Sequence, residues 1–177
     1  ADIGAIAHDA GAAVEVIIAT AWDCPFDGPT PPQRVLDVVD AACERGADRI
    51  AIADTIGTAT PGRVTDLVHL VRPRLGERPL GAHFHNTRGV GLASAWAAVS
   101  AGVTRLDSSV GGLGGCPFAP GASGNIATED LVYLLRDSGI EVDIDLTAAI
   151  EAARVARSVV GHELPSALLR AGDRVRG

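Results

Sequence analysis

A single cysteine, Cys116, stands inside a glycine run with the sequence Val110-Gly-Gly-Leu-Gly-Gly-Cys-Pro-Phe118. Because glycine has no Cβ, such a run can turn with positive φ and close its backbone over a ligand. The thiol is then the reactive side chain between Leu113 and Pro117, and we interpret it as a proton donor or a nucleophile. The alternative is a glycine-rich loop in which the cysteine is a small, inert packing residue.

Two histidines, His83 and His85, are two residues apart in an apolar run, so a β-strand would turn both toward the same side. Together they can bind one metal ion, or both can be core histidines satisfied by hydrogen bonds. Asn125, at the far end of the glycine-rich loop, can add an amide oxygen. Mg²⁺ or Mn²⁺ would require still more oxygen ligands, preferably a carboxylate.

Asp54 ends another apolar run and is a candidate acid, base or supporting group for the histidines. Alternatively, it is a turn or helix-capping aspartate ahead of Thr60-Pro61. Thr55 follows it directly and is a candidate substrate-binding residue. Arg88 follows the histidines and can hold a carboxylate or the phosphates of a substrate, or it is a surface arginine that opens a helix.

Four apolar, β-branched runs alternate with helical patterns and would position these side chains. The runs cover residues 13–20, 49–54, 80–85 and 104–110. Thr30-Pro31 and Thr60-Pro61 each predict a helix with proline at its first position, and Gly46, Gly102 and Gly139 predict helix ends. Further helices are predicted over residues 1–10, 127–138 and 146–160, followed by a tail that contains Pro165.

Polar residues lie at or just past the carboxyl end of each predicted strand, which is where a (β/α)8 barrel places its active site. They are Asp23 and Cys24, Asp54 and Thr55, His83 and His85, and Ser108 and Ser109. This favours a barrel over a doubly wound sheet. Such a barrel has about 250 residues, so four strands form half of one. An isolated half would expose two strand edges, and we expect it to be incomplete, obligately associated, or the remainder of a longer protein.

The composition narrows the class of protein. The 177 residues carry a formal net charge of −7 with 15 scattered Lys and Arg, which argues against a nucleic-acid partner. Three distant cysteines favour a reducing, cytoplasmic setting over a disulfide framework. No apolar run approaches the roughly 18 residues of a membrane span. The chain contains no Met and starts at Ala1 inside a predicted helix, so we expect a truncated polypeptide.

The segment 109–118 resembles the active-site signature of the hydroxymethylglutaryl-CoA lyases, and residues 121–133, Gly-Ala-Ser-Gly-Asn-Ile-Ala-Thr-Glu-Asp-Leu-Val-Tyr, continue the match. Asp54-Thr-Ile-Gly57, Thr60-Pro-Gly62 and His83-Phe-His85 stand in the family's order. The resemblance covers essentially the whole chain but only the C-terminal half of the family's barrel. We therefore predict an α/β fold, a partial (β/α)8 TIM barrel with about the last four βα units plus C-terminal helices, as one domain over residues 1–177.

The resemblance implies metal-dependent cleavage of a 3-hydroxy-3-methylglutaryl thioester to acetyl-CoA and acetoacetate. It implies that His83, His85 and Asn125 bind Mg²⁺ or Mn²⁺ and that Cys116 acts as an acid on the carbanion. Asp54 would be the second catalytic residue, with Thr55 and Arg88 in contact with the acyl-CoA. Where the family commonly has Asp-Thr-Tyr after the second histidine, this chain has Asn86-Thr-Arg88, which could alter the acyl group accepted.

The resemblance also sets limits. The family's first-strand aspartate ligand and its neighbouring arginine, and an acidic residue of the second strand, lie outside this sequence, so we expect this chain alone to be inactive. The full-length form is expected to be a cytoplasmic homo-oligomer, a dimer, serving leucine breakdown. The alternatives are a lyase for another branched 3-hydroxyacyl-CoA, a condensing enzyme of the same barrel class, and a non-catalytic half-barrel that serves in assembly.

Overall fold

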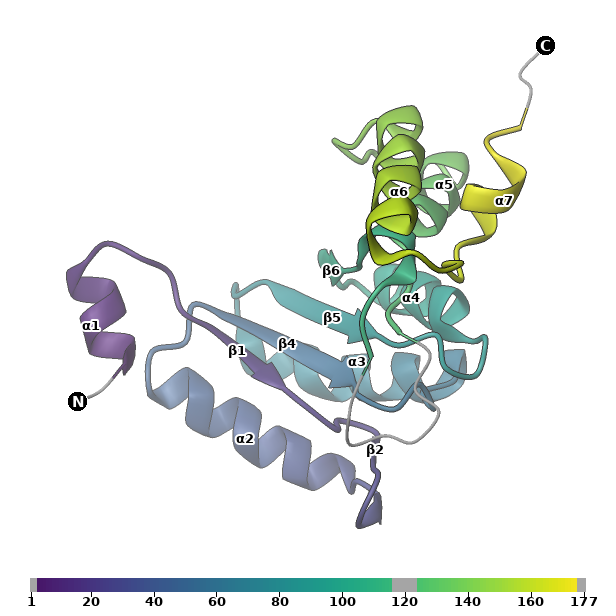
Figure 1. Ribbon diagram of the computed structural model, residues 1–177. Helices are drawn as coiled ribbons and strands as arrows, with labels where there is room; N and C mark the ends of the chain where they lie inside the picture. The colour runs from purple at the N-terminus through teal and green to yellow at the C-terminus, as the bar shows by residue number, and fades with distance from the viewer. Residues whose placement is uncertain (1–2, 116–123, 175–177) are drawn as a thin grey trace.

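A computed structural model describes residues 3–115 and 124–174 (Figure 1). The main sheet contains β1 (Glu15–Ile18), β4 (Arg49–Asp54), β5 (Leu80–Phe84) and β6 (Arg105–Asp107), and a small second sheet contains β2 (Asp23–Cys24) and β3 (Gly28–Pro29). The helices are α1 (Ile3–Asp9), α2 (Pro32–Glu44), α3 (Pro61–Leu75), α4 (Gly91–Ser100), α5 (Thr128–Asp137), α6 (Leu146–Val160) and α7 (Ala167–Ala171), with a 3₁₀ turn at Val110–Gly112.

The four main strands are parallel and lie side by side in chain order, β1-β4-β5-β6. Helices α2, α3 and α4 connect successive strands and lie on one face of the sheet (Figure 1). A doubly wound sheet would reverse its strand order and carry helices on both faces. The predicted α/β fold, a partial barrel with four βα units, is therefore confirmed.

The two faces of the sheet differ in chemistry because successive side chains of a strand point to opposite sides. On the helix side, Ile50, Leu80 and Phe84 have no exposed surface and belong to the main hydrophobic core. On the other side, Ala53 of β4 is in register with His83 of β5. The face that bears His83 therefore corresponds to the interior of a barrel.

Strands β1 and β6 form the two edges of the described sheet. Ile17 of β1, which is 56% exposed, and the exposed Arg105 and Asp107 of β6 lie on the sheet face that bears His83, the face that a complete barrel would enclose. A closed barrel would pair these edges, because closure is what removes unpaired strand edges. The two unpaired edges agree with the expectation that four strands form half of a barrel.

Helix α2 begins one residue later than Thr30-Pro31 predicts. Its first residue is Pro32, and Pro31 is the extended N-cap with φ −60° and ψ 131°. The cause is steric, since a residue that precedes proline is pushed out of the helical region. The Thr30 hydroxyl instead donates to the Thr20 carbonyl at 2.7 Å. Helix α3 begins at Pro61 with Thr60 as its N-cap, as predicted.

The C-terminal tail contains a short helix, α7, that the sequence prediction missed. The buried Asp130 carboxylate of α5 accepts hydrogen bonds from the Ala167 and Leu168 backbone amides and from the Ser166 hydroxyl, at 2.8–3.1 Å. These contacts satisfy amides at the start of α7, which have no partner within the helix. The tail is thereby attached to α5.

Candidate metal and substrate site

The structure brings His83, His85 and Asn125 together at the carboxyl end of β5. The two imidazole centroids are 4.9 Å apart, with the ring planes at 78°. His85 forms an isolated antiparallel bridge with Asn125, so the chain returning from the glycine-rich loop runs beside the end of β5. The backbone bond from Asn86 N to Gly124 O, at 3.1 Å, fixes the same pairing.

His85 is held in one tautomer. Its Nδ1 lies 2.8 Å from the main-chain oxygen of Asp54, and the ring is only 7% exposed. Because a carbonyl oxygen only accepts, Nδ1 carries a hydrogen, and in the neutral imidazole Nε2 then keeps its lone pair. A metal-binding histidine is commonly oriented in this way, by a carbonyl on its other nitrogen.

His83 is half-buried in β5, and burial lowers the pKa of its imidazole from the ordinary value of 6.5. The neighbouring His85 lowers this pKa further, while the carboxylates of Asp107 and Asp54 act in the opposite direction. The net direction favours the neutral imidazole, which is the form that binds a metal ion.

The side-chain amide of Asn125 has one satisfied and one unsatisfied end. Its Nδ2 donates to the Leu113 carbonyl at 2.9 Å, which fixes the orientation of the amide. Its Oδ1 is buried without a hydrogen-bond partner among the described residues. An unpartnered buried acceptor costs about 1–3 kcal/mol, so a bound cation would relieve the cost.

The donors therefore fit a divalent ion held by His83, His85 and the Asn125 oxygen. Within residues 3–115 and 124–174, no group of three His, Cys, Asp or Glu side chains could hold a metal ion. A metal site at the two histidines would therefore need the amide oxygen as its third donor. Mg²⁺ or Mn²⁺ would still need further oxygen ligands.

Two glycines let the backbone approach the Asn125 side chain closely. Gly114 and Gly124 have φ values of +105° and +100°, a region that side chains rarely adopt. A Cβ on Gly114 would lie 2.7 Å from Asn125 Nδ2. Cys116, the predicted acid, lies outside the described residues.

Asp54 is 1% exposed and makes hydrogen bonds through both its main chain and its side chain. Its main-chain oxygen holds His85, whereas its carboxylate accepts from the amides of Thr58 at 3.0 Å and Ala59 at 2.9 Å. These contacts match the turn-aspartate alternative and give the residue an anchoring place beside the histidines. Its role as a catalytic acid or base stays a prediction.

Thr55 and Arg88, the predicted substrate contacts, lie near the same strand ends. The Thr55 hydroxyl oxygen accepts from the Thr20 amide at 2.8 Å, which links the loops that follow β1 and β4. Arg88 is exposed and donates through Nη1 to the Ile56 carbonyl at 2.5 Å. Substrate binding by both residues stays a prediction.

Asp23 connects the loop after β1 to this anchoring loop, a role that the sequence did not indicate. Its Oδ2 accepts from the Thr58 hydroxyl at 2.5 Å and from Arg63 at 2.8 Å. Burial alone would raise the pKa of Asp23, but the hydrogen bonds from Arg63 and Thr58 and the charges of Arg63 and Arg88 outweigh it and lower that pKa. An acidic residue after a strand was a signal for Asp23, but its partners are distant in sequence.

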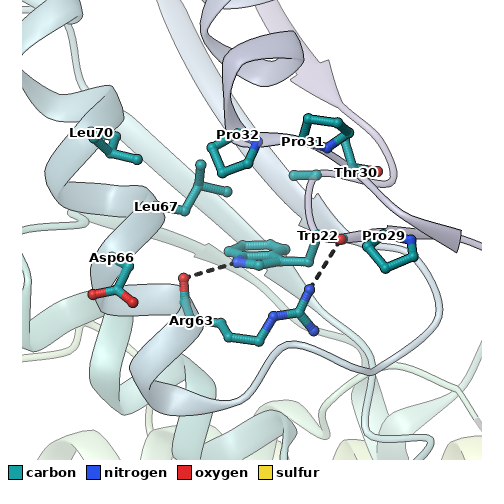
Figure 2. A pocket seen from close by; sticks show the side chains of 10 residues that line it. Trp22, Pro29, Thr30, Pro31, Pro32, Arg63, Asp66, Leu67 and Leu70 are labelled. Carbon is teal, nitrogen blue, oxygen red and sulfur yellow. Dashed lines mark hydrogen bonds between the residues drawn. The ribbon is translucent and has the colours of Figure 1, made fainter.

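A pocket of about 380 Å³ lies between the start of α2, α3 and the segment around β3. Figure 2 shows the side chains that line this pocket. The Trp22 indole donates to the Arg63 carbonyl and the Arg63 guanidinium donates to the Trp22 carbonyl, both at 3.1 Å. The residues that line this pocket include none of the predicted site residues. It is therefore separate from the candidate site.

A protein-family model described as HMGL-like matches residues 2–156. The chain belongs to the HMGL-like family. Its resemblance to the hydroxymethylglutaryl-CoA lyases is thereby confirmed, and relatives of that name reach 37–41% identity. The match includes Asp54, His83, His85 and Asn125, whose individual roles it does not test.

Curated relatives of this HMGL-like chain are about twice as long. An (R)-citramalyl-CoA lyase of Chloroflexus aurantiacus is 43% identical over 89% of the chain and 50% of the relative. A hydroxymethylglutaryl-CoA lyase of Bacillus subtilis is 37% identical over 90% of the chain and 54% of the relative. The chain thus spans about half the length of the relatives it matches.

Solved structures give the same result for this HMGL-like chain. A Bacillus subtilis HMG-CoA lyase superposes with a TM-score of 0.91 at 36% identity, over 96% of this chain and 57% of that one. An Acinetobacter baumannii HMG-CoA lyase, solved with coenzyme A and 3-methylmalate, gives 0.86 at 43% identity over 92% and 53%. No helix among the described residues is long and apolar enough to cross a membrane.

Proposed function

We propose that this chain is the carboxyl-terminal half of a divalent-metal-dependent carbon–carbon lyase that acts on a 3-hydroxyacyl-CoA. The first candidate reaction is the cleavage of hydroxymethylglutaryl-CoA to acetyl-CoA and acetoacetate. The buried, unpartnered Asn125 oxygen beside His83 and His85 is the observation that carries the proposal. Relatives named as lyases of CoA thioesters support it.

Each residue of the candidate site has its own proposed role in this reaction. His83, His85 and Asn125 would hold Mg²⁺ or Mn²⁺, which when bound would polarise the hydroxyl and carboxylate oxygens of the substrate. Arg88, exposed beside the site, would bind the substrate carboxylate.

Carbon–carbon cleavage then follows loss of the hydroxyl proton to a base. The C2–C3 bond breaks, its electron pair enters the thioester enolate, and C3 becomes the ketone of the second product. The Cys116 thiol donates its proton to the enolate carbon to give acetyl-CoA. An ordinary thiol pKa of about 8.5 keeps the proton available near pH 7.

A citramalyl thioester is the second candidate substrate, favoured by the 43% identity to the Chloroflexus lyase. It has the same tertiary 3-hydroxyl group, but a carboxylate is attached directly to that carbon. The same bond cleavage therefore releases pyruvate in place of acetoacetate. Arg88 replaces the tyrosine common in the hydroxymethylglutaryl-CoA lyases and is the first residue to test for this choice.

A chimera tests both reactions. This chain replaces the matching half of the Bacillus subtilis hydroxymethylglutaryl-CoA lyase, which restores the strands that the chain does not contain. We expect Mn²⁺-dependent release of acetyl-CoA, with acetoacetate identifying the first substrate and pyruvate the second. A folded chimera that binds Mn²⁺ and cleaves neither thioester would contradict the proposal.

The metal assignment predicts a loss of affinity in the His85→Ala variant of this chimera. Removing a ligand should lower Mn²⁺ affinity by more than the roughly 10–100-fold that loss of an outer hydrogen-bond partner costs. Isothermal titration measures the affinity. His69→Ala is the matched control, because His69 lies exposed on α3. Equal affinities in the two variants would remove His85 from the metal site.

The remaining assignments belong to the same proposal: an acyl-CoA substrate, a cytoplasmic homodimer in the full-length form, and a role in leucine breakdown. The relatives named hydroxymethylglutaryl-CoA lyase support the acyl-CoA substrate, and the location, the dimer and the pathway follow from the family resemblance alone.

A further inference from the structure

The two histidines of the site differ in how their rings are oriented. His85 has a carbonyl acceptor on Nδ1, the main-chain oxygen of Asp54. His83 faces the neighbouring strand β6, where the parallel register places Asp107 opposite it. The Asp107 Oδ2 atom lies 3.7 Å from His83 Nδ1.

The surroundings of Asp107 leave its carboxylate available to His83. Arg105 lies two residues earlier on the same face of β6, and its guanidinium is directed to Glu15 at 3.5 Å. The separation of 3.7 Å exceeds hydrogen-bond range by about 0.5 Å. Because the Asp107 side chain is 56% exposed, little packing opposes a shift of this size.

Direct binding of a metal by Asp107 is not favoured by the geometry. Among the described residues, the two histidines and this carboxylate do not form a group that could hold one ion. An acceptor on Nδ1 would instead fix the ring so that Nε2 faces the ion, as the Asp54 carbonyl does for His85.

We propose that Asp107 is a positioning residue of the metal site, which accepts a hydrogen bond from His83 Nδ1–H and thereby directs His83 Nε2 toward the ion. This inference rests on the proposed metal-dependent function. It assigns a role to a residue of the last strand that neither the sequence patterns nor the family match had singled out.

The tautomer of His83 in the metal-free 177-residue chain tests the hydrogen bond. Nitrogen-15 NMR of the imidazole should show Nδ1 protonated in the wild type and in Asp107→Asn, whose amide oxygen also accepts. In Asp107→Ala the proton should move toward Nε2. Asp143→Ala, at another exposed acidic position, should match the wild type.

Two NMR results would overturn the proposal. The first is a wild-type His83 ring that is protonated on Nε2. This result would reject the hydrogen bond even if the Asp107→Ala chain failed to fold. The second is a folded Asp107→Ala chain with an unchanged tautomer.

Mn²⁺ titration of the same chains tests the consequence. Asp107→Ala should lower the affinity about 10–100-fold, and Asp107→Asn should recover most of it. Lost affinity with an unchanged tautomer would make Asp107 a direct ligand and overturn the positioning role. A wild-type chain and chimera that both fail to bind Mn²⁺ would count against the proposed function, while the tautomer would still decide the hydrogen bond.

Discussion

Replacing Cys116 by alanine in the chimera is expected to lower kcat by about 10²–10⁴-fold, the usual contribution of a positioned acid or base. Mn²⁺ affinity should stay unchanged, because the proposed ligands are two imidazoles and an amide. Without the thiol, the enolate would take its proton from water. Steady-state kinetics and isothermal titration on one preparation measure both quantities.

The control for this substitution is Cys43→Ala, at a half-buried free cysteine that packs against the main core. Cys43→Ala should change the stability of the protein more than its turnover, because Cys43 lies on α2 and packs against the core. Unaltered turnover in Cys116→Ala would reject the thiol as the proton donor. Lost Mn²⁺ binding in the same variant would instead indicate a structural role for the loop.

Gly124→Ala should weaken Mn²⁺ binding and lower turnover by about 10²-fold. The new Cβ would lie 2.3 Å from the Gly112 carbonyl oxygen and 2.6 Å from that of Gly114. Both contacts are with backbone, so the segment that carries Asn125 must move. A displacement of about 1 Å at a reacting centre can cost about 10²-fold in rate.

Gly139→Ala is the matched control for this variant. Gly139 also has a positive φ, +80°, but a Cβ there meets no atom within 4 Å. The comparison separates the general cost of alanine in the left-handed region, about 1–2 kcal/mol, from the collision at residue 124. Thermal unfolding and Mn²⁺ titration of both variants measure the two effects. Equal Mn²⁺ affinities would mean that the loop does not position Asn125.

The sequence predicted best where a pattern repeats within one element. Residues 146–160 were predicted as a helix and form α6 with the same limits, because an apolar period of 3.6 continues up to Gly161. The spacing of His83 and His85 likewise predicted that both lie at one strand end, on the same face. The hairpin of β2 and β3 was missed, since strands of two residues have no period to detect.

Tertiary contacts decided what the patterns left open at the site. The sequence placed Asp54 at a strand end and allowed a turn aspartate, but it did not indicate that the main-chain oxygen of Asp54 holds His85. It suggested Asn125 as an oxygen donor but not that the Leu113 carbonyl orients the amide. Both facts depend on chain segments that meet only after folding.

The hydrogen bond between His85 and the main-chain oxygen of Asp54 limits what a substitution at position 54 can reveal. Every amino acid supplies a backbone carbonyl, so a codon change at position 54 alters the carboxylate and leaves this acceptor in place. A saturation screen at position 54 would therefore report on the carboxylate, through its anchoring of the following loop and its predicted catalytic role, and not on the acceptor of His85. The contribution of the acceptor would become visible through chemical synthesis, with a backbone carbonyl of altered basicity at that one position.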